Sequence, residues 1–203
     1  MLLVCLTGNY GMGKSSVLNL FKEIGALTIS SDEIVSSLLE DKDVIEKIKS
    51  LFREDVINNN GTLDKSKVAD LVFKDSTYRH ALEDILHPLV FKKIKEYINR
   101  IKDKGVIVVV EMPLVFERGY EGRFDRIITV YTEEEVALRR LEGKGIDRHK
   151  SLMRLRAQMP VSEKIRRSDF VIDNNGTIEQ TMNQVKEIFL QLKGLEGSNI
   201  ENC

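Results

Sequence analysis

The stretch from Leu2 to Val17 reads L-L-V-C-L-T-G-N-Y-G-M-G-K-S-S-V. It contains a short apolar run, a glycine-rich loop and the first residues of a helical pattern. An apolar run without alternating polar residues predicts a strand that is covered on both faces. The loop, Gly8–Ser15, fits the pattern G-x-x-x-x-G-K-[ST], which lies between a strand and a helix. This order predicts an α/β fold that carries a phosphate-binding loop (P-loop).

Each residue type in the P-loop has a chemical reason. Glycines let the backbone wrap closely, so that successive N–H groups point at a phosphate at the positive end of a helix. Lys14 supplies a full positive charge toward the β- and γ-phosphates, and the Ser15 hydroxyl is placed to coordinate Mg²⁺. A turn that only caps a helix would leave Lys14 without a role. The loop alone leaves ATPases, GTPases and several kinase classes open, although the chain has no N-K-x-D sequence that reads guanine.

Four further apolar runs follow, and each is separated from the next by segments of helical pattern. Strands that alternate with helices predict a parallel sheet with right-handed crossovers, here a five-stranded one. The first helix is expected to begin near Lys14 and to end at Gly25. The four further predicted strands are Ala26–Ile29, Val106–Val110, Ile127–Tyr131 and Phe170–Ile172.

The segment between the second and third predicted strands is far longer than a crossover requires, and its pattern is mainly helical. It predicts an inserted helical subdomain with a turn at residues 58–61. Pro88 is expected to kink or restart the last helix. The predicted helices of the insertion are Asp32–Glu40, Val44–Phe52, Lys65–Phe73 and Tyr78–Ile101.

Composition limits the class of protein. With 203 residues, 42% hydrophobic and 31% charged, the chain has the length of one domain and is neither collagenous nor wholly disordered. No apolar run approaches the roughly 20 residues that a membrane span needs, so we expect a soluble cytoplasmic protein without a membrane partner. Cys5 and Cys203 predict neither a disulfide framework nor a metal site.

The overall charge of −1 implies no global attraction to nucleic acid, but residues 139–167 carry ten Lys or Arg and three acids. The pattern predicts a helical hairpin, Glu133–Leu141 and Asp147–Gln158, with a flexible tip between them. Its basic residues are either a solvated helix face or a clamp for a polyanionic ligand. In the second case Arg140, Lys144 and Arg154 neutralise charge on a transferred phosphoryl group, and closure of the hairpin excludes water.

Two acids follow predicted strands at the edge where the P-loop lies. Asp32 comes after the second strand, where a kinase needs a carboxylate that takes the proton of an acceptor hydroxyl. The same residue is also a good helix cap, and position alone does not decide between the two roles. Glu111 ends the third strand and suits water or Mg²⁺ orientation, or is a solvated acid. His87, before Pro88, suits a structural or substrate contact better than a metal.

Taken together, these motifs resemble the dephospho-CoA kinase family, whose members phosphorylate the ribose 3'-hydroxyl of dephospho-CoA in the last step of coenzyme A synthesis. The family pattern has seven segments: a P-loop, D-A-D, G-x-L-D, H-P, D-x-P-L-L-x-E, a basic lid and A-D-x-V-I-x-N. All occur here in order over nearly the whole chain, which makes the resemblance specific. They match Gly8–Ser15, Ser30–Asp32, Gly61–Asp64, His87–Pro88, Glu111–Glu117, Arg140–Gln158 and Ser168–Gly176.

The resemblance implies a three-layer P-loop kinase fold, similar to nucleoside monophosphate kinases, with a helical substrate-binding insertion and a helical lid. It implies ATP as co-substrate, Mg²⁺, and Asp32 as general base, with Lys14 and Arg140 offsetting phosphoryl charge. Substrate contacts are expected from Asp32, His87, Glu111 and Pro113, and lid contacts from Lys144 and Arg154. Contacts to ATP are expected from Gly8, Gly11, Met12, Gly13, Lys14, Ser15, Ser16, Arg140, Asn174 and Gly176, with Ser15 on the metal.

Several positions depart from the family pattern. Ser30 and Glu111 replace Asp residues, Asn9 and Met12 replace the usual Gly and Ser, and lysines at 65 and 144 replace arginines. Lys144 keeps the charge but lacks the two-pronged guanidinium. The lid also has about one residue fewer at 143–147. None of these departures removes a group that the mechanism needs.

We therefore expect a single domain and a kinase acting on small molecules as a monomer or weak homo-oligomer, without a nucleic-acid partner. Two alternatives stay open: another small-molecule or nucleoside kinase, and a non-catalytic nucleotide-binding module whose basic hairpin grips nucleic acid or protein. The expected extents are a core at 1–31, 104–136 and 168–193, an insertion at 32–103, a lid at 137–167 and a frayed tail at 194–203.

Overall fold

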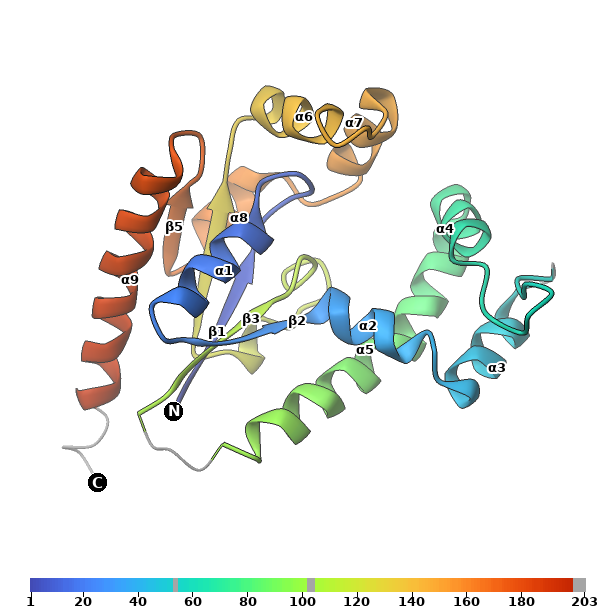
Figure 1. Cartoon of the computed structure of the whole chain (residues 1–203), viewed down its shortest axis with the longest axis horizontal. Helices are drawn as coiled ribbons and strands as arrows, with labels where there is room; N and C mark the ends of the chain where they lie inside the picture. The colour runs from blue at the N-terminus through green and yellow to red at the C-terminus, as the bar shows by residue number, and fades with distance from the viewer. Residues whose placement is uncertain (53–54, 102–104, 199–203) are drawn as a thin grey trace. The chain divides into compact units, whose positions relative to one another are not determined.

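The computed structural model describes residues 1–52, 55–101 and 105–198, and these form two compact units. The first, the sheet unit, comprises residues 1–30 and the described residues from 105 onward. The second, the helical unit, comprises the described residues of the segment 31–102. Both units contain helices. Figure 1 shows the chain coloured from blue at its N-terminus to red at its C-terminus.

The sheet unit is built on five parallel strands, as the sequence predicts. The structure gives their order, which is β2-β3-β1-β4-β5. The central strand β1 is almost wholly buried, because it is flanked by strands on both sides and covered on both faces. The P-loop therefore leaves the middle of the sheet. The strands are β1 (Leu2–Thr7), β2 (Leu27–Ser30), β3 (Ile107–Glu111), β4 (Arg126–Tyr131) and β5 (Phe170–Asp173).

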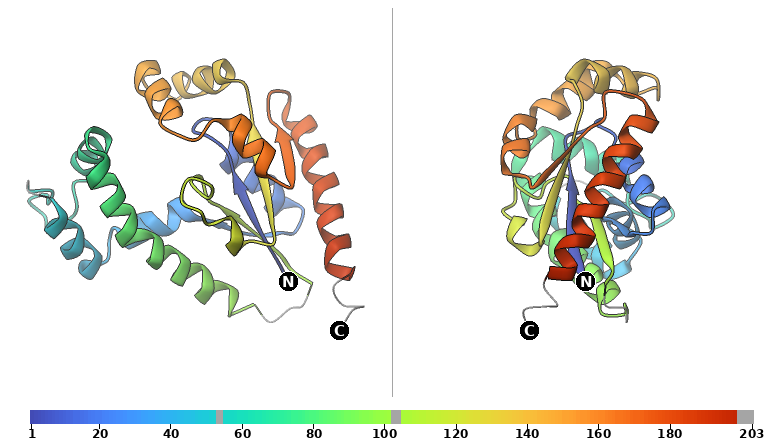
Figure 2. Two further views of the ribbon diagram at one scale, coloured as in Figure 1. Left: turned by 180° about the vertical axis from the view of Figure 1, so that it is seen from behind. Right: turned by 90° about the vertical axis from the view of Figure 1, so that its left-hand side faces the viewer.

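Helices cover both faces of this sheet and complete three layers. On one face α1 (Lys14–Glu23) packs beside α9 (Ile178–Ser198), and an apolar core that includes Phe21 and Phe189 lies between these helices and the strands. The opposite face carries α8 (Val161–Arg167), which is in front of the strands when the molecule is seen from behind (Figure 2). The predicted three-layer fold is confirmed.

The remaining helical segments of the sheet unit are α6 (Glu134–Glu142), α7 (Arg148–Arg156) and the single 3-10 turn η1 (Glu121–Arg123). Helices α6 and α7 form the α6–α7 hairpin, near the two helices predicted there. The sequence analysis missed α8, whose seven residues are too few to show a helical period. Residues 194–198 are helical, although a frayed tail was predicted; the rest of that tail, 199–203, lies outside the described residues.

The helical unit contains four helices, and aspartate side chains cap three of them by accepting backbone N–H groups: Asp41, Asp64 and Asp75. The predicted turn is present, with Gly61 at φ +78°. Pro88 does not restart the helix, because one helix runs through this proline and buried residues on both sides of it hold the two halves in place. The alternative, a kink at Pro88, stays a prediction. The helices are α2 (Ser31–Leu38), α3 (Lys42–Leu51), α4 (Lys65–Lys74) and α5 (Ser76–Ile98).

A buried ion pair joins α8 to the segment that follows β3, within the sheet unit. The Lys164 side chain has no exposed surface, and its Nζ lies 2.7 Å from Glu117 Oε1 and donates to the Pro113 carbonyl over 2.8 Å. Burial lowers the pKa of the Lys164 ammonium, whereas the hydrogen bond and the charge of Glu117 act in the opposite direction. The carboxylate is therefore what keeps a charged amine tolerable inside the protein.

Replacing Glu117 by Ala is expected to lower the free energy of unfolding by about 3 kcal/mol, because it leaves the buried amine without its counter-charge. Urea unfolding followed by circular dichroism measures this loss. The control is Arg166→Ala, which breaks the exposed pair with Glu163 on the same helix and is expected to cost less than about 0.5 kcal/mol. Equal losses in both variants would show that the buried pair has no special structural role.

Candidate active site

The P-loop connects β1 to α1 along a path that requires glycine at several positions. Gly13 has a φ of +90°, which side-chain-bearing residues rarely adopt, and a Cβ there would collide with the Asn174 amide. A Cβ on Gly8 would collide with the Val130 carbonyl. The loop backbone is thus pressed against the ends of β4 and β5, and its N–H groups lie at the start of α1.

Asn174, which follows β5, is 6% exposed, and its side chain is hydrogen-bonded to the P-loop. Its Nδ2 donates to the Met12 carbonyl over 2.9 Å, and its Oδ1 accepts from the Thr181 hydroxyl over 3.0 Å. Its backbone N–H donates to the Tyr131 carbonyl. Because both ends of the amide are engaged within the protein, the side chain of Asn174 shapes the P-loop.

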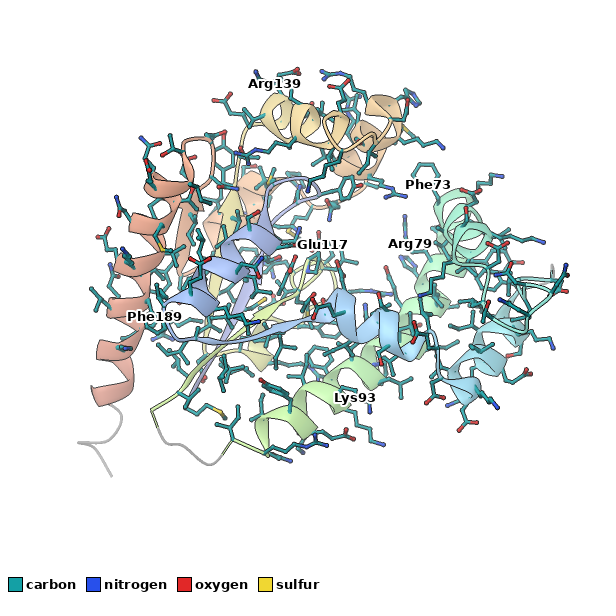
Figure 3. The ribbon with its side chains drawn as sticks, viewed as in Figure 1. Phe73, Arg79, Lys93, Glu117, Arg139 and Phe189 are labelled. Carbon is teal, nitrogen blue, oxygen red and sulfur yellow. The ribbon has the colours of Figure 1, made fainter. Side chains whose placement is uncertain are left out.

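Arg140 lies beside the loop. Its Nη2 donates to the Asn174 carbonyl over 2.8 Å, and its Nη1 is 3.7 Å from the position that a Cβ on Gly13 would occupy. The neighbouring Arg139 is exposed and points away from the sheet on the outer side of α6 (Figure 3). Only one of the two successive arginines therefore brings its charge to the phosphate-binding loop.

Arg148 of α7 joins the two helices of the α6–α7 hairpin through ion pairs with α6. Its Nη2 lies 2.7 Å from Glu135 Oε2, and its Nη1 lies 3.1 Å from Glu142 Oε2. The hydrogen bond from Arg148 holds the pKa of Glu135 below its usual value. Lys144, predicted to act in the lid, is exposed at the tip of the hairpin. Arg154 lies over the Tyr10 ring, with its Cζ 5.4 Å from the ring centroid, and so contacts the P-loop through its side chain.

Lys14 and Ser15 begin α1, directly after the loop. Lys14 is 9% exposed, and its Nζ donates to the Asn9 carbonyl over 3.1 Å. The Ser15 hydroxyl donates to Glu111 Oε1 over a long 3.4 Å, and Glu111 is 3% exposed at the end of β3. A hydroxyl and a carboxylate this close form a donor set of hard oxygen ligands, which suits Mg²⁺. Among the described residues, no cluster of three or more His, Cys, Asp or Glu could hold a metal ion.

Other predicted loop residues have packing roles. Met12 is 2% exposed in an apolar cluster with Ala137, Leu138 and Leu155, so its side chain anchors the hairpin to the loop. Gly11 lies under α6, where a Cβ would lie 2.7 Å from Leu141 Cδ1, and a Cβ on Gly176 would meet Gln180. Ser16 is exposed on the first turn of α1.

Pro113 was predicted to contact substrate, but its carbonyl accepts hydrogen bonds from the Thr7 hydroxyl and the Lys164 ammonium. Two further predicted residues belong to the helical unit. Asp32 is exposed in the first turn of α2, two residues beyond the end of β2, and His87 is half-buried in α5. The sheet unit by itself brings together Lys14, Ser15, Glu111, Arg140 and Asn174.

Sequence reasoning missed residues that support the loop. Thr181 orients the Asn174 amide, and the side chains of Asn9 and Gln158 join the loop to the residues after α7. The sequence did offer a signal for a special role of Asn9, since this residue replaces the glycine that is usual in the family. Gln158 had none, because its partner Tyr10 is distant in sequence. Thr181 had none either, because it belongs to no motif although Asn174 is only seven residues away.

Comparison with known proteins identifies the chain. A family model described as dephospho-CoA kinase matches residues 2–180. The chain belongs to the dephospho-CoA kinase family. A curated dephospho-CoA kinase of Geobacillus kaustophilus is 35% identical over 200 residues, which cover 96% of this chain and 98% of the relative. That of Aquifex aeolicus is also 35% identical, over 92% of this chain and 95% of its own.

Solved structures agree with this membership. The protein in a crystal structure of TT1252 from Thermus thermophilus has 35% sequence identity to this chain, and the two structures have a TM-score of 0.82. The match covers 94% of this chain and 97% of that one. Dephospho-CoA kinase from Campylobacter jejuni is 25% identical with a TM-score of 0.67, over 95% and 97% of the two chains. Shikimate kinase from Acinetobacter baumannii, at 14% identity and a TM-score of 0.54 over 95% and 93%, shares the fold alone.

Replacing Gly13 by Ala is expected to raise the KM for ATP about tenfold or more, since the new Cβ displaces the Asn174 amide and, with it, the Met12 carbonyl. Steady-state kinetics measure the change. Gly25→Ala is the matched control: it lies beyond the other end of α1 at φ +96°, with open space around a Cβ. It should lose similar stability and keep its KM within about twofold. A similar rise in the KM of both variants would mean that backbone strain alone matters.

Proposed function

We propose that the protein transfers the γ-phosphoryl group of ATP to the ribose 3'-hydroxyl of dephospho-CoA, giving coenzyme A and ADP. Membership of the dephospho-CoA kinase family, shown by a match over residues 2–180, carries the choice of acceptor. The P-loop supports the choice of donor, because Lys14 and Arg140 bring two positive charges to a backbone cradle at the start of a helix.

The residues of the sheet unit divide the work on ATP. The N–H groups of residues 11–16 bind phosphate oxygens, as glycine at 11 and 13 allows. Lys14 exchanges the Asn9 carbonyl for phosphate oxygens, and Arg140 offsets negative charge as the γ-phosphoryl group leaves. The backbone of 174–176 lies beside the adenine. A Mg²⁺ ion held by Ser15, with Glu111 orienting its water, would neutralise charge shared by the β- and γ-phosphates.

Asp32 is the proposed general base, and the D-A-D position of the family supports this role. Ser30 pairs with Glu111 in the sheet register, and Asp32 follows it by two residues along the chain. A carboxylate there accepts the proton of the acceptor hydroxyl as the oxygen attacks phosphorus. His87, Glu111 and Pro113 are proposed to contact dephospho-CoA, although the Pro113 carbonyl is already used within the core. Lys144 and Arg154 are proposed to act when the hairpin covers the site.

Within the described part of the chain, no helix has both the length and the apolar character that a bilayer span demands. We propose that the enzyme works in the cytoplasm on small molecules, as a monomer or weak homo-oligomer. The basic residues of the α6–α7 hairpin support a role in clamping phosphate rather than nucleic acid, since Arg140 lies on the P-loop and Arg148 is engaged by two glutamates.

Product analysis tests the reaction and the acceptor together. The purified chain is mixed with Mg²⁺ and ATP and, in separate reactions, with dephospho-CoA, shikimate or a nucleoside, and the products are separated by mass. We expect coenzyme A and ADP only in the reaction with dephospho-CoA. Phosphorylation of another alcohol would favour a different small-molecule kinase, and ADP release without any phosphorylated acceptor would contradict the proposal.

Replacing Asp32 by Asn is expected to lower kcat by about a hundredfold or more, because the amide cannot accept the hydroxyl proton. The Kd for ATP, measured by calorimetry, should stay within about twofold, since the nucleotide lies on the sheet unit. Glu33→Gln removes the neighbouring acid from the same helical turn and should keep kcat within about twofold. A fully active Asp32→Asn variant would remove Asp32 from the mechanism.

A further inference from the structure

The P-loop is hydrogen-bonded to the segment that leaves the α6–α7 hairpin, residues 158–160, here called the exit segment. Asn9 Nδ2 donates to the Met159 carbonyl over 3.0 Å. The next residue, Tyr10, donates its backbone N–H to Gln158 Oε1 over 2.7 Å. These two adjacent bonds connect the phosphate-binding loop to the C-terminal end of the hairpin, although the residues are far apart in sequence.

Asn9 is hydrogen-bonded to three residues: Met12, Lys14 and Met159. Its backbone carbonyl accepts from the Lys14 ammonium over 3.1 Å and from the Met12 N–H over 3.3 Å. Its side-chain amide holds the exit segment. The residue is 4% exposed, so these contacts are shielded from water. One residue therefore links the lysine that approaches the phosphates to the end of the hairpin.

The other side of the exit segment is attached to the core. The Met159 N–H donates to Glu117 Oε1 over 3.2 Å, and the same carboxylate is paired with the buried Lys164. Lys164 in turn holds the carbonyl of Pro113, next to the end of β3. The exit segment thus has a fixed attachment through Glu117 and a second attachment through Asn9, on a loop that receives the nucleotide.

The Asn9 side chain lies beside a pocket and is hydrogen-bonded at one end. Its Oδ1 is buried and has no hydrogen-bond partner among the described residues. A buried acceptor without a partner opposes folding. Asn9 also lines a cavity of about 520 Å³ with Met12, Leu155, Gln158 and Pro160, so there is open space beside the bonded segment. Among the described residues, the Nδ2 bond to the Met159 carbonyl is therefore the hydrogen bond that the Asn9 amide makes, at the edge of this pocket.

We propose that Asn9 is a positioning residue that couples nucleotide at the P-loop to the α6–α7 hairpin. When Lys14 turns from the Asn9 carbonyl to the phosphates, the backbone at residue 9 loses a cationic partner, and its amide transmits the resulting shift to Met159. The inference rests on the proposed binding of ATP. It does not depend on which alcohol accepts the phosphoryl group.

Hydrogen exchange of the full-length chain tests the coupling, with and without Mg²⁺ and saturating β,γ-imido-ATP. In the wild type, the nucleotide should slow exchange both in the P-loop, residues 8–16, and in residues 148–159. In Asn9→Ala the protection of the P-loop should remain, while the protection gained by residues 148–159 falls by about half or more. Asn9→Asp keeps the size and loses the donor, so it should behave like Asn9→Ala.

The matched control is Asn60→Asp, which makes the same chemical change at an exposed turn. Asn60 Oδ1 accepts from the N–H and the hydroxyl of Thr62, and an aspartate keeps both bonds. This variant should show the protection pattern of the wild type. The coupling is overturned if nucleotide fails to protect residues 148–159 in the wild type, or protects them equally in the wild type and both Asn9 variants.

Kinetics give a second readout that a purely structural role would not move. Asn9→Ala should raise the KM for ATP about fivefold, the effect of one lost hydrogen bond, and should increase ATP hydrolysis without acceptor relative to transfer. The KM for dephospho-CoA should stay within about twofold. A lower melting temperature with unchanged KM and unchanged hydrolysis would overturn the proposal. If dephospho-CoA is not the acceptor, the exchange experiment still decides the coupling, since it uses nucleotide alone.

Discussion

The close approach of the P-loop backbone to its neighbours is the constraint on which the rest of the sheet unit depends. Residues 8–13 pass close to β4, α6 and the residue after β5. A Cβ on Gly8, Gly11 or Gly13 would meet an atom of Val130, Leu141 or Asn174, respectively. The loop is therefore shaped by packing from outside as well as by its own turn. Its N–H groups reach their positions only because the strands β1, β4 and β5 are adjacent in the sheet.

The same packing joins the loop to the groups that carry charge. Arg140 reaches Gly13 through the carbonyl of Asn174, whose side chain holds the Met12 carbonyl. Met12 in turn packs into the base of the α6–α7 hairpin. The residues that follow the hairpin are anchored in turn by the buried pair of Lys164 and Glu117, because Glu117 also accepts the Met159 N–H. The hairpin is thus attached to the core at both ends, and at both ends it touches the P-loop.

Much of the fold follows from local patterns. The five strands lie within about one residue of the predicted bounds, because short apolar runs between helical segments favour the strands of a parallel sheet. Helix α1 begins at Lys14 as predicted, since the P-loop pattern includes the start of its helix. The two errors have different causes, one local and one tertiary. Seven-residue α8 shows no period, and Pro88 does not end α5 because burial on both sides of it outweighs the lost hydrogen bond.

The sequence by itself determined the parallel sheet, the P-loop with Lys14 and Ser15, and the resemblance to dephospho-CoA kinases, because these are written in contiguous residues with fixed spacing. Tertiary structure decided which of the candidate side chains meet. It showed that Asn174 supports the loop with its amide, that Arg140 rather than Arg139 lies on the loop, and that Asn9 holds the exit segment. Such contacts join residues far apart in the chain, and only the packed sheet and helices bring their side chains within hydrogen-bonding distance.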